Sequence, residues 1–180
     1  DPMEKIPVVY ILGRGHSGST LLDLCLGGLP EVESVGEIGM LSRYYKNNGM
    51  CTCGQRFLKC SYWSTILEEA QKKLGEPLEE LTDIHPIKER KSRLQKVLDT
   101  PIKQWSNATL NQYGSRNEAI LRSVLEYTGK TMIVDSSKNW HRLHLLKSSG
   151  FFDVKVIYLF RDGRSALESR KRKARKTGDA

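Results

Sequence analysis

The apolar positions of this chain fall into two kinds of run. Short continuous runs rich in β-branched residues predict buried strands, and apolar residues three or four positions apart predict helices with one buried face. Strand-like runs lie at 8–12, 32–36, 131–134 and 154–160. Because helical stretches separate these runs, the sequence predicts an α/β domain with a mostly parallel sheet flanked by helices.

The helical pattern is clearest after the first strand and in the middle of the chain. A first helix is expected over 19–27, because Gly28 and Pro30 follow its apolar positions. The segment 61–127 has helical periodicity in three or four pieces, one of them a charged helix over 88–99. We therefore expect one domain, 1–180, with 61–127 as a helical insertion or lid.

The loop between the first strand and the first helix is rich in small residues. It reads GRGHSGST from Gly13 to Thr20. Such a loop leaves several backbone N–H groups aimed at one point, where the helix dipole also favours an anion. The spacing is that of a P-loop, but Ser19 stands where a nucleoside triphosphatase needs lysine. The sequence predicts a phosphate or sulfate site and argues against ordinary ATP or GTP hydrolysis.

Polar residues follow the other predicted strands. Glu37 follows the second, Asp135 and Lys138 the third, and Arg161 the last. In an open parallel sheet, ligands bind outside the carboxyl ends of the strands, so these residues can share a crevice with the loop. A helix-capping surface glutamate is the alternative for Glu37. Asp135 resembles the magnesium-holding carboxylate of P-loop enzymes, which keeps a kinase or triphosphatase as an alternative.

The net charge of +8 is concentrated at one end of the chain. Eight basic residues and two acidic ones lie between Arg161 and Lys176. A solvated helix face, a nucleic-acid-binding patch and an anion site are the three interpretations of this segment.

Three cysteines, Cys51, Cys53 and Cys60, lie within a polar, turn-rich stretch. They are too few for a four-thiolate zinc site and lack the paired C-x-x-C spacing. Reduced structural thiols are expected, with a metal site or a disulfide as alternatives. Cys25, on the first helix, is expected in the core.

The sequence contains no apolar run as long as a membrane helix, and its first residues lack the apolar region of a signal peptide. With Met3 as the natural start, a cytoplasmic protein is expected. The alternative is a catalytic domain of the Golgi lumen that has been separated from its membrane anchor.

Four motifs in a fixed order carry a resemblance to a known family. GRGHSGSTLL, SVGEIG, VDSSK and VIYLFRDGRSALES resemble the sulfotransferases that use 3′-phosphoadenosine 5′-phosphosulfate (PAPS). The chain is most similar to the branch with a glutamate base, which includes tyrosylprotein sulfotransferases and many bacterial enzymes. The resemblance implies a P-loop-type fold and sulfuryl transfer to a hydroxyl or an amine. Adenosine 3′,5′-bisphosphate would be released, and no metal is expected.

The resemblance also assigns the donor-binding residues. The 3′-phosphate would be held by Arg161 and Ser169, so the basic end would need no nucleic acid as its partner. Arginine suits this role because its planar fork binds a phosphate dianion through two bonds. The 5′-phosphosulfate would be held by the loop residues Arg14, Gly15, His16, Ser17, Gly18, Ser19 and Thr20.

The catalytic residues implied by the resemblance are Glu37 as the base and Lys138 as the donor to the leaving oxygen. This chain departs from the family at His16, where relatives have lysine or arginine. Imidazole is cationic only below about neutral pH at its ordinary pKa. We expect His16 to donate to the leaving oxygen. Arg14 as the donor, or a merely structural His16, is the alternative.

A second departure is length. Relatives continue past the 3′-phosphate helix to a basic, glycine-containing loop, whereas this sequence ends at Ala180. The C-terminal part of the fold is therefore expected to be missing. The acceptor is expected to be a small molecule, a carbohydrate or a peptide, with no nucleic-acid or membrane partner, and the sequence does not predict the oligomeric state.

Overall fold

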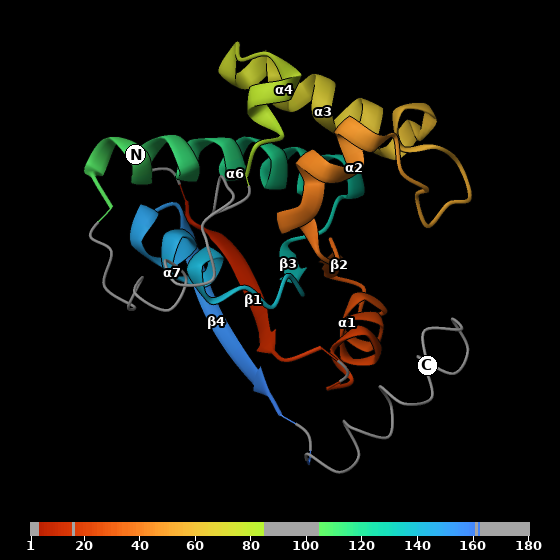
Figure 1. Cartoon of the computed structure of the whole chain (residues 1–180), viewed down its shortest axis with the longest axis vertical. Helices are drawn as coiled ribbons and strands as arrows, with labels where there is room; N and C mark the ends of the chain where they lie inside the picture. The colour runs from red at the N-terminus through yellow and green to blue at the C-terminus, as the bar shows by residue number, and fades with distance from the viewer. Residues whose placement is uncertain (1–3, 16, 85–104, 161, 163–180) are drawn as a thin grey trace, which may run out of the picture.

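The structure is a computed structural model that describes residues 4–15, 17–84, 105–160 and 162 (Figure 1). Its strands are β1 (Ile6–Gly13), β2 (Val32–Ser34), β3 (Met132–Asp135) and β4 (Phe152–Leu159). Its α-helices are α1 (Ser19–Gly27), α2 (Leu41–Asn47), α3 (Ser61–Leu74), α4 (Leu78–Leu81), α6 (Asn107–Thr128) and α7 (Trp140–Ser149). Short 3-10 turns lie at Ile38–Met40 and Phe57–Lys59.

The four strands form one sheet in the order β2-β3-β1-β4, and every described pair is parallel. β1 pairs with β4 from Ile6 opposite Phe152 to Gly13 opposite Leu159, so the two strands end side by side. The α/β class is confirmed, and the described sheet is entirely parallel. The charged helix predicted over 88–99 lies outside the described residues.

Helices cover both faces of the sheet. Successive side chains of a strand point to opposite faces. Accordingly, Val8 and Tyr10 of β1 belong to the main core, which includes α3, α6 and α7, whereas Val9 and Ile11 pack in a second cluster with residues of α1. Figure 1 shows α3 and α4 as an outer layer over α6. Burial on both faces explains why the two central strands, β1 and β3, are nearly continuous apolar runs.

Part of the segment 61–127 belongs to the core. Four residues of α6, at helical spacing, are almost fully buried: Ala119, Ile120, Leu121 and Val124. Their burial confirms the helical periodicity expected there. The interpretation of 61–127 as an insertion or lid stays a prediction. Within the described part of the chain, no helix has the length and apolar content needed to cross a bilayer.

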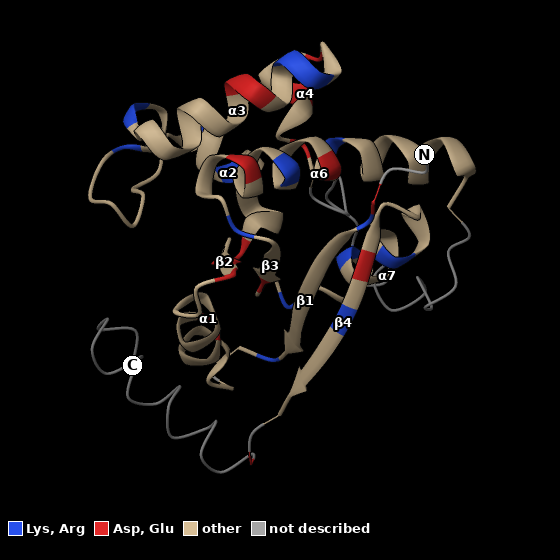
Figure 2. Cartoon of the chain, turned by 180° about the vertical axis from the view of Figure 1, so that it is seen from behind, with Lys and Arg blue, Asp and Glu red and all other residues tan. Residues whose placement is uncertain are grey.

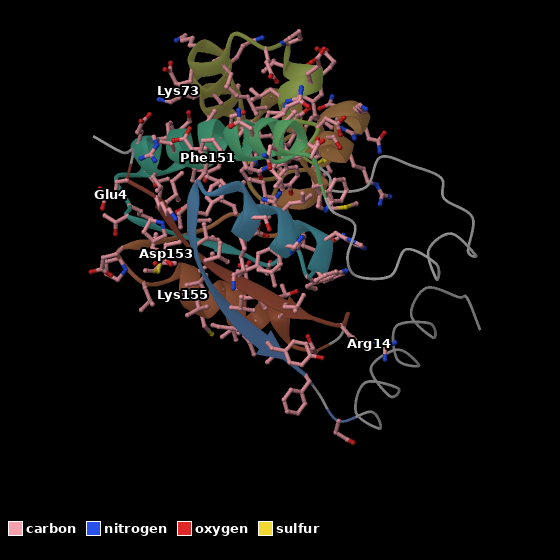
Figure 3. The ribbon with its side chains drawn as sticks, turned by 90° about the vertical axis from the view of Figure 1, so that its left-hand side faces the viewer. Glu4, Arg14, Lys73, Phe151, Asp153 and Lys155 are labelled. Carbon is pink, nitrogen blue, oxygen red and sulfur yellow. The ribbon has the colours of Figure 1, made fainter. Side chains whose placement is uncertain are left out.

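β4 lies at one edge of the described sheet and carries one acidic and one basic residue (Figure 2). Asp153 and Lys155, labelled in Figure 3, are exposed on this strand and form an ion pair at 3.3 Å. Charged side chains on an edge strand disfavour pairing with the strands of other molecules.

The order of the strands places a switch of direction between β1 and β3. From β1 the chain passes through α1 to β2 at one edge of the described sheet, and from β3 it passes through α7 to β4 at the other. Neighbouring strands whose connections leave in opposite directions open a crevice at their carboxyl ends, where ligands bind. The loop after β1 and the segment after β3 lie at the place where this rule expects a ligand.

The prediction for Cys25 is wrong, although α1 has the predicted bounds. Cys25 is exposed, and Leu21 and Leu24 are 68% and 66% exposed. The helix turns a different face to the sheet, defined by the i, i+3, i+4, i+7 spacing. The buried or half-buried residues on that face are Ser19, Leu22, Asp23 and Leu26.

Candidate functional site

The loop between β1 and α1, described except for His16, ends at the N-terminus of α1. Gly18 caps α1 in a left-handed conformation, with φ +96°, which glycine adopts without steric cost. The first intrahelical bond of α1 runs from the Leu22 N–H to the Gly18 carbonyl at 3.1 Å, so the preceding N–H groups have no acceptor within the helix. The Ser17 hydroxyl oxygen is buried and has no hydrogen-bond partner among the described residues.

The residues predicted to bind the donor are described in part. His16, Arg161 and Ser169 lie outside the described residues. Arg14 and Gly15 are exposed just beyond the end of β1, where Figure 3 labels Arg14. Gly18 and Thr20 are exposed and Ser19 is buried.

The ends of β1 and β4 lie very close together. A Cβ atom added to Gly13 would lie only 2.5 Å from the carbonyl oxygen of Leu159, so the residue at this position must be glycine. The loop after β1 and the segment after β4 therefore leave the sheet from neighbouring points.

Glu37 and Lys138, which are 101 residues apart, are in direct contact. The Lys138 Nζ donates to Glu37 Oε1 at 2.5 Å. The Lys138 side chain is 18% exposed and that of Glu37 is 48% exposed, so the pair is accessible from solvent. The two residues predicted to be the base and the leaving-group donor are thus brought together at the carboxyl ends of β2 and β3.

The backbones of the two motifs around this pair are linked. The Ser136 N–H donates to the Gly36 carbonyl at 2.9 Å, and the Gly39 N–H donates to the Ser137 hydroxyl at 2.9 Å. Lys138 itself has φ +59°, a conformation that is uncommon for a residue with a side chain. Such conformations persist only where the surroundings fix them, and they gather at functional sites.

Asn139 and Tyr10 hold the backbone that follows Lys138. The Tyr10 hydroxyl donates to the Asn139 carbonyl at 2.7 Å and accepts from the Asn139 N–H at 3.0 Å. The Asn139 side chain in turn caps α7 by accepting from the N–H groups of His141 and Arg142. Burial is the main cause of the raised pKa of Tyr10, so this hydroxyl stays protonated and keeps its donor role.

A buried ion pair joins the end of β3 to α7, on either side of Lys138 in the sequence. Asp135 and Arg142 are both 0% exposed, and Arg142 Nε donates to Asp135 Oδ2 at 2.8 Å. Arg142 Nη1 also donates to the Tyr113 hydroxyl at 2.7 Å and to Asn117 Oδ1 at 2.8 Å. Burial opposes the charge of Arg142 most strongly, but Asp135, Tyr113 and Tyr10 together outweigh it, and the pKa of Arg142 is raised.

This pair bears on the kinase alternative. Asp135 Oδ1 accepts from the Ser137 N–H at 2.9 Å while Oδ2 accepts from Arg142. Both oxygens of the carboxylate are therefore engaged within the protein interior, and the resemblance of Asp135 to a magnesium ligand finds no support in its contacts.

Asp23 is a buried carboxyl group of α1 that the sequence did not point to. Its Oδ2 accepts from the Ser34 hydroxyl at 2.8 Å, and its Oδ1 has no hydrogen-bond partner among the described residues. Burial is the main cause of the raised pKa of Asp23, partly offset by the Ser34 hydrogen bond. The sequence signal for its burial was its spacing: Asp23 lies four residues after Ser19, so both residues share the inner face of α1.

The cysteines at 51–60 are free thiols that lie close together. The Sγ atoms of Cys51, Cys53 and Cys60 all lie within 4.8 Å of one another. Burial is the main cause of the raised pKa of Cys60. Burial alone would also raise the pKa of Cys51, but hydrogen bonds from the Cys53 backbone and from neighbouring side chains outweigh it and lower that pKa.

Comparisons with known proteins give no match: neither a family model, nor a curated protein, nor a solved structure is significantly similar to this chain. What the chain does must therefore be inferred from its own residues.

Proposed function

We propose that this chain is a sulfotransferase that moves the sulfuryl group of PAPS to a hydroxyl or an amine of an acceptor. The observation that carries the proposal is the contact between Glu37 and Lys138 at the carboxyl end of the sheet. A carboxylate and an ammonium group at the place where a parallel sheet binds its ligands are the two groups that this reaction requires. The fold proposed with it is the P-loop-type fold of that family.

The β1–α1 loop fits the sulfonated end of such a donor. It offers the buried, unpartnered Ser17 hydroxyl and the first N–H groups of α1, which lack intrahelical acceptors. An anion at a helix N-terminus is favoured by the helix dipole as well as by these donors. We assign Ser17, Gly18, Ser19 and Thr20 to this end of the donor, with Arg14, Gly15 and His16 beside them, and Arg161 and Ser169 to the 3′-phosphate.

The proposed chemistry uses Glu37 and Lys138 in opposite roles. The donor supplies a sulfuryl group whose bond to the 5′-phosphate oxygen breaks as the acceptor oxygen bonds to sulfur. Glu37 takes the proton that the acceptor loses. Lys138 donates to the oxygen on which negative charge grows, and one such donor typically lowers a barrier by about 3 kcal/mol. His16 or Arg14 would add a second donor.

The acceptor is proposed only by class. A small molecule, a carbohydrate or a peptide that presents a hydroxyl or an amine to Glu37 fits the half-exposed position of that carboxylate. No metal is required in this mechanism, because the ammonium of Lys138 and the loop N–H groups provide the positive field.

Calorimetric titration with adenosine 3′,5′-bisphosphate in EDTA tests the donor site. We expect binding without metal, and we expect Ser17→Ala to weaken it about tenfold, as for a lost hydrogen bond to a charged group. Ser123→Ala is the matched control, because Ser123 also has a buried hydroxyl without a described partner but lies on α6.

Two results would contradict the assignment of the donor. The first is preferential binding of Mg-ATP, which would favour a kinase or triphosphatase. The second is that Ser17→Ala and Ser123→Ala weaken binding equally, which would show that the weakening does not come from the β1–α1 loop.

A further inference from the structure

A loop outside the proposed catalytic site brings three thiols together. Cys53 donates to Cys60 with their Sγ atoms 3.6 Å apart, and Cys51 completes a group whose sulfurs all lie within 4.8 Å of one another. Four thiolates placed tetrahedrally at a zinc–sulfur distance of about 2.3 Å lie about 3.8 Å apart. The three sulfurs are therefore already close to the separations that one zinc ion imposes.

The backbone from Cys51 to Gln55, which contains the first two cysteines, forms a tight turn. Cys51 N–H donates to the Gln55 carbonyl at 2.8 Å, and Gly54 N–H donates to the Cys51 carbonyl at 3.0 Å. Gly54 has φ +82°, and the turn is closed by the bridge between Met50 and Arg56. The turn fixes the positions of Cys51 and Cys53 without using their side chains.

The third thiol comes from the beginning of α3. Cys60 is 2% exposed and occupies the N-cap of that helix, and its carbonyl accepts from the Ser64 N–H at 2.9 Å. The loop thus joins one rigid, buried ligand to two ligands on a turn at the surface.

The charge around the group suits a metal thiolate. The sequence from Ile38 to Leu67 contains no aspartate or glutamate, whereas Arg56 and Lys59 flank the cysteines. Three thiolates and one zinc ion carry a net charge of about −1, which these cations can offset. No carboxylate of this stretch competes for the cations.

We propose that Cys51, Cys53 and Cys60 bind one zinc ion, with the fourth position of the tetrahedron open to water or another donor. Binding releases the thiol protons to solvent and changes no oxidation state. The ion links the turn at 51–54 to the start of α3. Phe57 and Cys60 are the two buried residues of the described stretch 47–60, so a metal crosslink would hold a loop with few core contacts. The proposal does not rest on the proposed transferase activity.

Titration of the reduced full chain with Co²⁺ tests the site directly. We expect the absorption of tetrahedral cobalt with thiolate charge transfer, saturating at one ion per chain and lost on addition of one equivalent of Zn²⁺. Cys53→Ser should weaken cobalt binding on the order of 100-fold, and because Cys53 is exposed this variant should fold. Cys25→Ser is the matched control, since Cys25 is an exposed free thiol on α1.

Three results would overturn the proposal. They are the absence of a cobalt–thiolate spectrum from the reduced wild-type chain, equal loss of binding in Cys25→Ser and Cys53→Ser, and a disulfide between Cys53 and Cys60 found by mass spectrometry of the chain purified without reductant. None of these readouts depends on PAPS, so failure of the metal site and failure of the transferase proposal are distinguishable.

Discussion

The buried pair of Asp135 and Arg142 gives the sharpest prediction about stability. Asp135→Asn preserves the size of the side chain, and its amide oxygen can still accept from the Ser137 N–H. It removes the charge that faces Arg142 Nε at 2.8 Å, in a place where both side chains are 0% exposed. The guanidinium keeps its bonds to Tyr113 and Asn117. The change therefore removes the charge that compensates Arg142 together with the hydrogen bond from its Nε, because the amide NH2 group then stands in the place of Oδ2.

An uncompensated charge left in a protein interior costs about 3–5 kcal/mol. We therefore expect Asp135→Asn to lower the free energy of unfolding by about 4 kcal/mol, a large part of the about 5–15 kcal/mol that stabilises a typical domain. With a slope of about 2.5 kcal/mol per molar urea, the midpoint should fall by about 1.6 M. Urea unfolding followed by circular dichroism measures this shift.

A double variant shows whether the pair itself is responsible. Removal of both charges, in Asp135→Asn with Arg142→Met, should cost less than the sum of the two single changes, because neither partner is then left unpaired. Glu69→Gln is the control, since Glu69 pairs with Lys72 on the surface of α3 and its loss should leave the midpoint unchanged. A loss below about 1 kcal/mol for Asp135→Asn, or strictly additive effects, would refute the reasoning.

Two further predictions concern residues next to the site. Tyr10→Phe removes the hydroxyl that bonds both backbone groups of Asn139. We expect this change to lower the free energy of unfolding in urea by about 1–3 kcal/mol and to weaken binding of adenosine 3′,5′-bisphosphate, because Lys138 adjoins Asn139. Unchanged stability would contradict this role. Burial raises the pKa of Asp23 above its usual 3.8, so the Asp23 carboxyl binds its proton more tightly in the native state than in the unfolded state. The free energy of unfolding should therefore fall as the pH rises from about 3.8 through the native pKa of Asp23. Asp23→Asn should have a flatter profile of urea midpoint against pH between 3.5 and 7, and a profile that matches the wild type would show that Asp23 is not the source.

The sheet could be predicted from the sequence because its central strands, β1 and β3, are apolar runs buried on both faces. Each predicted run overlaps a strand of the structure, and α1 has its predicted bounds. The β1–α1 loop was also readable, because glycines and hydroxyl residues between a strand and a helix have few other structural uses. The general rule for ligands in parallel sheets placed Glu37 and Lys138 at the same edge, and the structure brings them into contact.

Buried polar groups are what sequence patterns missed. Helix α7 was not predicted, because the charged Arg142 lies on its inner face beside Leu143, Leu145 and Leu146 and interrupts the apolar periodicity. The groups that compensate Arg142 come from β3 and α6, far away in the chain. A pattern of local hydrophobicity cannot show such partners.

The face of α1 was missed for a related reason. Its inner side contains Ser19 and Asp23, and its exposed side contains Leu21 and Leu24. Hydrophobicity alone therefore assigned Cys25 to the core, whereas the face of α1 that packs on the sheet combines Ser19 and Asp23 with Leu22 and Leu26.

Transfer of labelled sulfate from PAPS to a pool of hydroxyl and amine acceptors tests the central claim most directly. The contact between Glu37 and Lys138 predicts transfer by the wild-type chain, a loss of about 10²–10⁴-fold in Glu37→Gln as for a missing general base, and unchanged binding of adenosine 3′,5′-bisphosphate in the same variant. Glu69→Gln, which removes a carboxylate of equal 48% exposure from another ion pair, should transfer at the wild-type rate. No transfer by the wild-type chain, or equal transfer by Glu37→Gln and Glu69→Gln, would contradict the account.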